Sequence, residues 1–424
     1  MKLNSTDDLY RYLDSIPAFQ HEGAAAAKLD LERFRAFCGE IGDPQESYPS
    51  IHVAGTNGKG STCQILGAIY HNAGYKTGVY TSPHLLEYRE RFQVDGEYIP
   101  EERLLEFINT YRARIEAAAL SYFELSTAIA FWWFHVQQVD IAVIETGLGG
   151  RLDATNILRP EVSVITNVSR DHTDILGEDI LDIAKEKAGI IKFHTPVVVG
   201  NASEEVRTLI RKEAARQWGA VYEVHSLNPT WKMGICTLAE GEHQYHFATD
   251  LNNSVQAYNI AAAWYVVKLL GDSFNISEDQ FREGLKQVKS TFNLPGRFEK
   301  LDPGKEWYFD GAHNLEAVRA MTASVERIKP LNRAVLVLSL MKDKIDREMM
   351  AEFQKFKKIY YYTSGSKRSA GMGEIKKWLP DAEPFPDEQP LFLKELESEL
   401  VIFAGSFYFY SSVRKLLQTL HSDQ

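Results

Sequence analysis

The sequence predicts an α/β protein in which helices cover a largely parallel sheet. From about residue 50, short runs of β-branched residues alternate with longer segments of helical periodicity, and this alternation is typical of parallel strands joined by helices. A Gly-rich turn separates the first such run from the first such helix. Because 424 residues exceed what one hydrophobic core usually supports, we expect two domains.

The first alternation begins with SIHVA at residues 50–54, which we expect to be a strand. The helix after the Gly-rich turn ends at Gly74. The helix expected at 124–138 is apolar nearly all round, which predicts burial. The other elements expected in this part are strands at 77–80, 140–145, 162–166 and 196–200, helices at 101–119, 257–270 and 278–288, and a hairpin at 233–247.

Pro295 and Gly296 interrupt the periodicity, and we place the domain boundary there, with domains at 1–295 and 296–424. A second alternation follows and predicts a smaller α/β domain. Its aromatic run at 359–362 is most simply a central strand. The elements expected in it are strands at 306–310, 334–340, 358–363 and 400–405, and helices from Leu315, near 346–356 and after the last strand.

Composition narrows the function classes. The net charge of −11 disfavours a nucleic-acid or anionic-membrane partner. Cys38, Cys63 and Cys236 lie far apart without a CxxC pair, so they suggest neither a disulfide framework nor a zinc site. The N-terminus does not resemble a signal peptide, and no apolar stretch approaches the ~20 residues of a membrane span. We therefore expect a cytoplasmic protein without nucleic-acid or membrane partners.

The first Gly-rich turn, GTNGKGS at residues 55–61, stands between a predicted strand and a predicted helix. Its glycines allow backbone N–H groups to turn toward an anion, and the helix N-terminus adds a favourable dipole. Lys59 would then contact the outer phosphates. The spacing departs from GxxxxGK[ST], because Gly60 separates Lys59 from Ser61. A plain Gly-rich turn is the alternative, but the flanking elements favour phosphate binding.

Eight motifs in order along the chain make the assignment specific. They are HVAGTNGKGST (52–62), TSPHLLEYRERF (81–92), ETGLGGRLDATN (145–156), DHTDILG (171–177), EKAGIIK (186–192), PGRFE (295–299), DGAHN (310–314) and GSF (405–407). This set resembles the folylpolyglutamate synthase and dihydrofolate synthase family, which is related to the Mur ligases. The resemblance implies a Mur-ligase-like fold, with a large P-loop-type ATPase domain and a smaller C-terminal α/β domain, and by family default a monomer.

The resemblance also implies an activity. Such enzymes use ATP to add L-glutamate to dihydropteroate or to a folate through an acyl phosphate, releasing ADP and phosphate, and the motifs incline toward a bifunctional enzyme. One alternative is a Mur-type ligase of cell-wall precursors, against which the SPHL and GLGGRLDATN motifs argue. The other is a non-catalytic ATP-binding regulator, which would need a broken metal set, whereas Glu145, His172 and Lys187 are all present.

A metal site is expected because a carboxylate acylates poorly until it is phosphorylated, and the phosphates need charge neutralisation. Glu145 ends a predicted strand, where ligands gather in α/β sheets. The resemblance adds Ser82, His172 and Lys187 as ligands of two Mg²⁺ ions, with Ser61 as a further contact, and is compatible with K⁺ or another monovalent cation. His172 alone would more often be structural, because Mg²⁺ prefers oxygen.

Lys187 matches the family lysine that is carbamylated and becomes an anionic oxygen ligand. The residues alone instead favour a solvated helix lysine paired with Glu186 or Asp182.

For the nucleotide, the resemblance adds contacts from the second part of the chain. Arg297 follows the predicted linker and would approach the phosphates on domain closure; an exposed interdomain salt bridge is the alternative. His313 would reach a phosphate or the glutamate, and joins Lys59, His172 and Lys187 as catalytic residues. The expected ATP contacts are Thr56, Asn57, Gly58, Lys59, Gly60, Ser61, Asn259, Arg297 and Asp310.

The expected folate or pteroate contacts come from three motifs. Asp153 could equally cap a helix or form an Asx turn, and Tyr122 and Phe123 could be plain core. The full set is Pro83, His84, Phe123, Glu124, Arg151, Leu152, Asp153 and Ala154.

Overall fold

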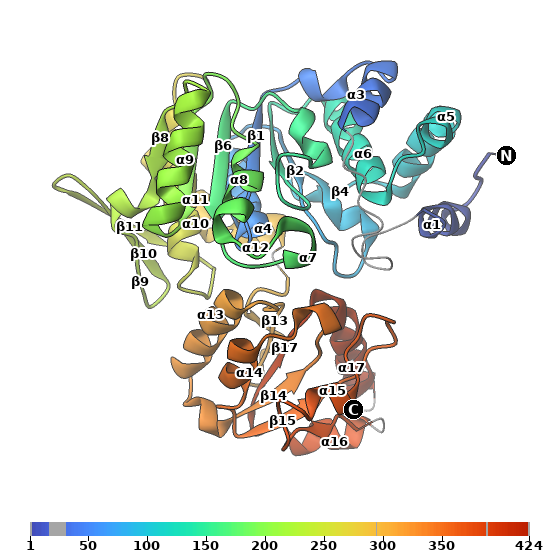
Figure 1. Ribbon diagram of the computed structural model, residues 1–424, viewed down its shortest axis with the longest axis vertical. Coiled ribbons are helices and arrows are strands. Elements are labelled where there is room, and N and C mark those ends of the chain that lie inside the picture. Colours follow the sequence, from blue (N-terminus) through green and yellow to red (C-terminus); the bar gives the residue numbers. More distant parts are fainter. Residues whose placement is uncertain (1, 17–30, 294, 387–388, 423–424) are drawn as a thin grey trace. The chain divides into compact units, whose positions relative to one another are not determined.

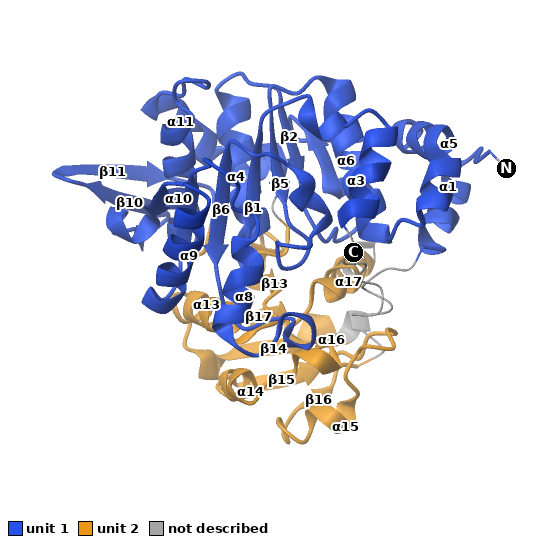
Figure 2. Cartoon of the chain, turned by 45° about the horizontal axis from the view of Figure 1, so that its top comes forward, with its two compact units in different colours: residues 1–251, 255–294 blue, residues 252–254, 295–424 orange. Residues whose placement is uncertain are grey.

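The computed structural model (Figure 1) describes residues 2–16, 31–293, 295–386 and 389–422. The chain divides into two compact units, which Figure 2 colours separately. Unit 1 comprises Met1–Leu251 and Val255–Leu294, and unit 2 comprises Asn252–Ser254 and Pro295–Gln424. Each unit has its own sheet and its own hydrophobic core. Among the described helices, none has the length and apolar character that a membrane span requires.

The main sheet of unit 1, as far as it is described, has eight strands in the order β4-β3-β2-β5-β1-β6-β7-β8. Strands β2, β5, β1, β6, β7 and β8 run parallel to one another. Strands β3 and β4 form an antiparallel extension beyond β2, at one edge of the sheet. The predicted first alternation is confirmed. The strands are β1 (Ser50–Ala54), β2 (Thr77–Tyr80), β3 (Phe92–Val94), β4 (Glu97–Tyr98), β5 (Ile141–Glu145), β6 (Val162–Asn167), β7 (Val197–Asn201) and β8 (Val221–Glu223).

Helices cover both faces of this sheet because its buried strands are apolar on both sides. Ile51, Val53 and Val143 face a core with α4 and α10 to α12, while Ala142 and Ile144 face a core with α3, α5 and α6. The helices are α1 (Thr6–Asp14), α3 (Leu31–Glu40), α4 (Lys59–Asn72), α5 (Glu101–Ala118), α6 (Tyr122–Gln137), α7 (Thr173–Leu176), α8 (Ile180–Ala188), α9 (Glu204–Arg216), α10 (Gln256–Leu269), α11 (Glu278–Lys286) and α12 (Val288–Phe292).

Two expectations for unit 1 are confirmed and one is refined. Helix α6 is buried from Glu124 to Phe134, as its apolar surface predicts. The predicted hairpin is formed by β10 (Ile235–Glu240) and β11 (His243–Ala248), and β10 also pairs with β9 (Thr230–Lys232). The single helix expected at 278–288 is in fact two, because Gln287 leaves helical geometry between α11 and α12.

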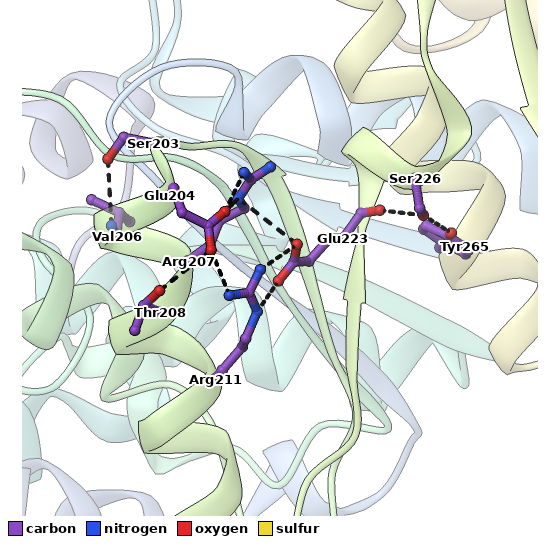
Figure 3. A network of polar contacts seen from close by, with 9 residues as sticks. All are labelled: Ser203, Glu204, Val206, Arg207, Thr208, Arg211, Glu223, Ser226 and Tyr265. Carbon is purple, nitrogen blue, oxygen red and sulfur yellow. Dashed lines mark hydrogen bonds and ion pairs between the residues drawn. The ribbon is translucent and has the colours of Figure 1, made fainter.

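The edge strand β8 is tied to helix α9 by a polar network (Figure 3). Arg211 bridges Glu223 on β8 and Glu204 in the first turn of α9, with N–O distances of 2.5 and 2.7 Å. Arg207 lies 3.7 Å from Glu223, and Ser203 caps the helix by accepting from Val206 N–H. Single exposed ion pairs contribute little, but a network that shares its carboxylates fixes geometry.

Unit 2 has a six-stranded sheet within the described range, in the order β12-β13-β17-β14-β15-β16, parallel except for β12. The aromatic run at 359–362 forms a strand inside the sheet, as predicted, because β15 lies between β14 and β16, although it pairs with β16 only at Tyr360 and Tyr361. The strands are β12 (Glu299–Lys300), β13 (Trp307–Asp310), β14 (Ala334–Leu338), β15 (Lys358–Tyr361), β16 (Glu383–Pro384) and β17 (Leu400–Ala404).

The helices of unit 2 follow the predicted alternation. Helix α13 begins at Leu315, as predicted, and Asn314 caps it by accepting a hydrogen bond from Ala317 N–H at 3.0 Å. The helices are α13 (Leu315–Glu326), α14 (Arg347–Phe353), α15 (Met372–Ile375), α16 (Gln389–Glu395) and α17 (Tyr410–Ser422).

Candidate active site

The Gly-rich loop joins β1 to α4 and passes close to two neighbouring segments. A Cβ on Gly55 would lie 1.9 Å from Thr166 Oγ1 at the end of β6, and one on Gly58 would lie 2.7 Å from Asn259 Oδ1 on α10. Gly58 also has a φ of +83°. Only glycine fits these two positions. Asn259, which belongs to unit 1, therefore packs directly on the loop.

Hydrogen bonds from the end of β6 and from Ser169 hold the same loop. Asn57 N–H donates to Asn167 Oδ1 at 2.7 Å, and Thr166 Oγ1 donates to the Asn57 carbonyl at 2.6 Å. Thr56 N–H donates to the Asn167 carbonyl at 3.1 Å, and its hydroxyl donates to the Ser169 carbonyl at 3.0 Å. The loop conformation is thus preorganised by its neighbours, as an anion-binding turn requires.

Two lysines share the carbonyl oxygen of Gly55. Lys59 Nζ donates to it at 3.1 Å and Lys187 Nζ at 3.0 Å. Lys187 is only 3% exposed, and burial together with the charge of Lys59 lowers the pKa of its ammonium to about 7. An ammonium that is buried in this way loses much of its hydration, so its neutral form is favoured.

The interpretation of Lys187 as a solvated helix lysine is therefore wrong. Both of its expected partners are engaged elsewhere: Asp182 pairs with Lys185 at 2.9 Å and Glu186 with Arg151 at 2.9 Å. Lys187 instead lies on the inner face of α8, toward the loop.

Glu145 lies at the carboxyl end of β5, as predicted, and is 3% exposed. Its Oε2 accepts a hydrogen bond from Ser82 N–H at 3.0 Å, and its Oε1 lies 4.0 Å from Lys59 Nζ. A Cβ on Gly60 would lie 3.4 Å from Oε2, so glycine keeps the space beside the carboxylate open. The fold thus brings Ser82, Glu145 and the Gly-rich loop together.

His172 stands at the start of α7 with a φ of +50°, and its N–H donates to Asp171 Oδ1 at 2.8 Å. In the part of the chain that the structure describes, no three His, Cys, Asp or Glu side chains form a group suited to a metal. The predicted ligand set combines Glu145 and His172 with Ser82 and a carbamylated Lys187, and it stays a prediction.

The GLGGRLDATN segment interlocks with the EKAGIIK segment. A Cβ on Gly150 would lie 2.7 Å from the Glu186 carbonyl oxygen, and one on Gly189 would lie 2.4 Å from Arg151 Cβ. Asn156 Nδ2 donates to the Gly189 carbonyl at 3.0 Å. The two motifs therefore form one packed unit, and this packing places Lys187.

Asp153 forms the turn that was considered as an alternative to a substrate contact. Its Oδ2 accepts from Gly147 and Leu148 N–H at 2.9 and 2.8 Å, and its Oδ1 accepts from both N–H and Oγ1 of Thr155. Burial raises the pKa of this carboxyl. Asp153 therefore shapes the loop after Glu145, and a direct substrate contact stays a prediction.

An aromatic wall adjoins this loop. The ring of Phe123 packs so closely on Gly147 that a Cβ there would lie 2.4 Å from it. Glu124 is the third residue of a capping box, with Oε2 accepting from Ser121 N–H at 2.7 Å and Oε1 paired with Arg33. Glu124 thus holds the start of α6, and its predicted substrate contact stays a prediction.

Three motifs of unit 2 converge on Phe407. The guanidinium carbon of Arg297 lies 4.0 Å from its ring centroid, the His313 ring lies 5.7 Å away, and Gly311 leaves no space for a Cβ beside it. Asp310, at the end of β13, accepts from Phe298 and Ala312 N–H at 3.0 and 2.9 Å. Burial raises its pKa to about 6, an effect that the charge of Arg297 opposes.

Known proteins resemble this chain along nearly all of its length. The family model Mur ligase middle domain matches residues 53–276, and the model Mur ligase, glutamate ligase domain matches residues 296–407. The dihydrofolate synthase/folylpolyglutamate synthase of Bacillus subtilis is 33% identical over 421 residues, which cover 92% of this chain and 95% of that protein. The chain belongs to the dihydrofolate synthase and folylpolyglutamate synthase family of Mur ligases.

Two further relatives extend the likeness. The folylpolyglutamate synthase of Lacticaseibacillus casei is 30% identical and covers 96% of this chain and 97% of that protein. The Mycobacterium tuberculosis folylpolyglutamate synthase, solved with ADP and AMPPCP, is 27% identical, with a TM-score of 0.85 and coverage of 97% and 98%. The predicted family and fold class are thus confirmed, and the protein is a ligase of this family.

Three residues that contact the predicted site residues were not predicted from the motifs. Thr166 and Asn167 hold the Gly-rich loop, and Arg91 lies beside His84, but none of the three was singled out. Arg91 belongs to the RERF end of a quoted motif, so its position carried a signal. Thr166 and Asn167 end the apolar strand β6 and have no local pattern that points to the loop.

Proposed function

We propose that this ligase uses ATP to join L-glutamate to dihydropteroate and to folate polyglutamates through an acyl phosphate, releasing ADP and phosphate. It is proposed to be bifunctional, as dihydrofolate synthase and folylpolyglutamate synthase. The observation that carries the proposal is the meeting of Glu145 and Ser82 with the preorganised loop that Lys59 and Lys187 also contact. Phosphate, cation and carboxylate chemistry are thereby collected at one edge of the sheet.

The phosphate half of the site is proposed to work through the loop and the first turn of α4. Backbone N–H groups and the helix dipole would hold the phosphates of ATP. Lys59, which now reaches back to the loop carbonyls, would turn to the outer phosphates. The acceptor carboxylate then attacks the γ-phosphoryl group, and the glutamate amine displaces phosphate from the acyl phosphate.

Two Mg²⁺ ions are proposed to bind beside this loop, and the absence of a side chain at Gly60, next to the buried carboxylate of Glu145, supports this. Glu145, Ser82 and His172, with Ser61 as a further contact, would hold them. When bound, the ions neutralise the phosphates and the developing charge. A monovalent cation such as K⁺ is proposed as a further cofactor.

Carbamylation of Lys187 is part of the proposal. An uncharged amine attacks carbon dioxide, a nitrogen–carbon bond forms, and a proton leaves to solvent. A pKa of about 7 leaves much of this amine uncharged at neutral pH, and the carbamate would give the metal site an anionic oxygen.

The C-terminal part, proposed as a domain at 296–424, would supply Arg297, Asp310 and His313 to the nucleotide or the glutamate. The N-terminal part, 1–295, would bind ATP with Asn259 and the folate with the residues of the three substrate motifs. A monomer in the cytoplasm, without nucleic-acid or membrane partners, completes the proposal and is tested by sedimentation and fractionation.

The deciding experiment is a parallel assay of the purified protein with dihydropteroate and with tetrahydrofolate monoglutamate. ADP and phosphate should appear only when an acceptor, L-glutamate and ATP are present together. Glu145→Gln serves as the inactive reference. Steady formation of AMP and pyrophosphate overturns the acyl-phosphate route.

The same preparation separates the two other candidate functions. A Mur-type ligase of cell-wall precursors would be stabilised against heat by a Mur substrate and not by dihydropteroate. A non-catalytic regulator would be stabilised by ATP yet release no ADP with any acceptor.

A further inference from the structure

Arg91 is a buried cation beside the proposed metal site. It ends the 3-10 helix Tyr88–Arg91, immediately before β3, and is 5% exposed. Its carbonyl accepts a hydrogen bond from Thr81 N–H at 3.2 Å, so its backbone is paired directly next to Ser82. A desolvated guanidinium is costly unless its donors are satisfied.

The surroundings of Arg91 satisfy it only in part. Its Nε donates to His84 Nδ1 at 2.9 Å. The rings of Tyr88 and Tyr122 lie 5.9 and 5.5 Å from the guanidinium carbon. Within the described part of the chain, no carboxylate pairs with Arg91, and its terminal Nη atoms have no protein acceptor.

The same aromatic cluster borders the loop that follows Glu145. Tyr122 is adjacent in sequence to Phe123, whose ring packs on Gly147. Phe123 also lies 6.2 Å from Tyr80, and Tyr88 lies 5.5 Å from Tyr122. The free donors of Arg91 therefore belong to an aromatic wall that adjoins Glu145, on the side of the proposed acceptor substrate.

A guanidinium offers donors only, so its ligand must offer acceptors in a plane. The acceptor substrates carry two kinds, carboxylates and the O4/N5 edge of the pterin ring. That edge has the geometry of guanine O6/N7, to which arginine binds with two parallel hydrogen bonds. Flanking tyrosine rings suit a flat heterocycle rather than a small hydrated anion.

We propose that Arg91 is a specificity-determining residue whose Nη donors bind the O4/N5 edge of the pterin ring of the acceptor. This inference rests on the proposed function, because it assumes a pterin-bearing substrate. In 7,8-dihydropteroate N5 is an acceptor, whereas in tetrahydrofolate N5 carries a hydrogen. Arg91 therefore contributes two hydrogen bonds to the first substrate and one to the second.

The test compares Arg91→Gln with Arg89→Gln as the matched control. Arg89 lies on the same 3-10 helix, but its guanidinium pairs with Glu87 at 2.7 Å. For Arg91→Gln we expect KM for dihydropteroate to rise roughly ten- to hundredfold, with a smaller rise for tetrahydrofolate and unchanged KM for ATP. The control keeps all three values. A rise confined to tetrahydrofolate overturns the proposal, because it assigns Arg91 to the glutamyl α-carboxylate instead.

Equilibrium binding separates this inference from the proposed function. Dihydropteroate binding, followed by the fluorescence of its pterin ring without ATP or glutamate, should weaken in Arg91→Gln even if no turnover is found. Binding of p-aminobenzoylglutamate, which lacks the pterin, should be equal in wild type and variant. Equal weakening of both ligands refutes the pterin contact. Arg91→Lys keeps the buried charge but loses the two parallel N–H donors of the guanidinium. If Arg91→Gln unfolds, this variant gives the same comparison between dihydropteroate and p-aminobenzoylglutamate binding.

Discussion

Two buried ionisable groups, Lys187 in unit 1 and Asp310 in unit 2, are 3% and 8% exposed and have opposite kinds of hydrogen-bond partner. Lys187 contacts the residue that follows β1, and Asp310 ends β13, so each lies at the carboxyl end of a parallel strand. Burial moves the pKa of the lysine down to about 7 and that of the aspartate up to about 6. Desolvation thus pushes both groups toward neutrality from opposite sides.

Their hydrogen-bond partners differ, and the difference indicates what each group can do. The ammonium of Lys187 shares one carbonyl oxygen, that of Gly55, with Lys59. The carboxylate of Asp310 receives two backbone N–H groups. A cation that shares its acceptor gains little from staying charged and is open to chemical change, whereas a carboxylate with two amide donors is held in place.

The strongest way to break this contrast is Lys187→Ala. We expect ligase activity to fall roughly 10²–10³-fold, because the proposed carbamate oxygen is lost from a charge-stabilising site. Formate or acetate should restore part of it by supplying a carboxylate. Lys185→Ala is the control, since that ammonium pairs with Asp182 at the surface. Full activity of Lys187→Ala would remove the carbamate from the mechanism.

The burial of Lys187 was beyond reach from the sequence. In AKEKAG, charges stand at helical spacing on both sides of it, and local pattern therefore predicts a solvated face. What buries Lys187 is the approach of Gly55 and Gly150, which come from segments distant in sequence. Non-local packing of this kind overrides local pattern.

Elements with strong local signals were predicted well, and weak ones were missed. Strands β1, β2, β5, β6 and β7 are apolar runs that periodicity identifies. Strand β3 has three residues, and β8 is held at the edge by ion pairs with α9, so neither has a clear period. Ser121 and Glu124 form a legible capping box that would have placed the start of α6 at Tyr122.

Asp310→Asn tests the effect of burial on the carboxyl group of Asp310 in unit 2, as Lys187→Ala tests the buried lysine in unit 1. The folded pKa of about 6 exceeds the unfolded value of 3.8, so the native state binds the extra proton between these values. The stabilisation from this proton is full below pH 3.8 and is lost as the pH rises through 6. The unfolding free energy of wild type relative to Asp310→Asn should fall by at most roughly 3 kcal/mol over this window. Urea titrations at several pH values measure it, and a pH-independent difference contradicts the buried-carboxyl account.

Gly150→Ala tests whether packing between the two motifs places Lys187. The new Cβ would meet the backbone oxygens of Glu186 and Lys187 at 2.7 and 3.0 Å, and backbone cannot step aside cheaply. We expect a loss of roughly 1–3 kcal/mol in stability, with a further loss of activity. Gly373→Ala is the control, because no atom lies within 4 Å of the added Cβ, and it should leave stability and activity unchanged. Unchanged melting and kinetics of Gly150→Ala would mean that the two motifs do not constrain each other.

The smallest expected effect concerns the turn that follows Asp310. Asn314 caps α13 through a 3.0 Å hydrogen bond from Ala317 N–H, so Asn314→Ala should cost about 1 kcal/mol, and Asn314→Ser should retain most of the stability. Ser203→Ala, the counterpart at α9 in unit 1, should cost less, because its hydrogen bond to Val206 N–H is 3.4 Å long. Thermal melts of the three variants rank them. An equal loss of stability in Asn314→Ala and Ser203→Ala would show that the length of the cap hydrogen bond does not set its contribution. The turn after Asp310 would then be held by the two backbone N–H groups that donate to Asp310, without help from the Asn314 cap.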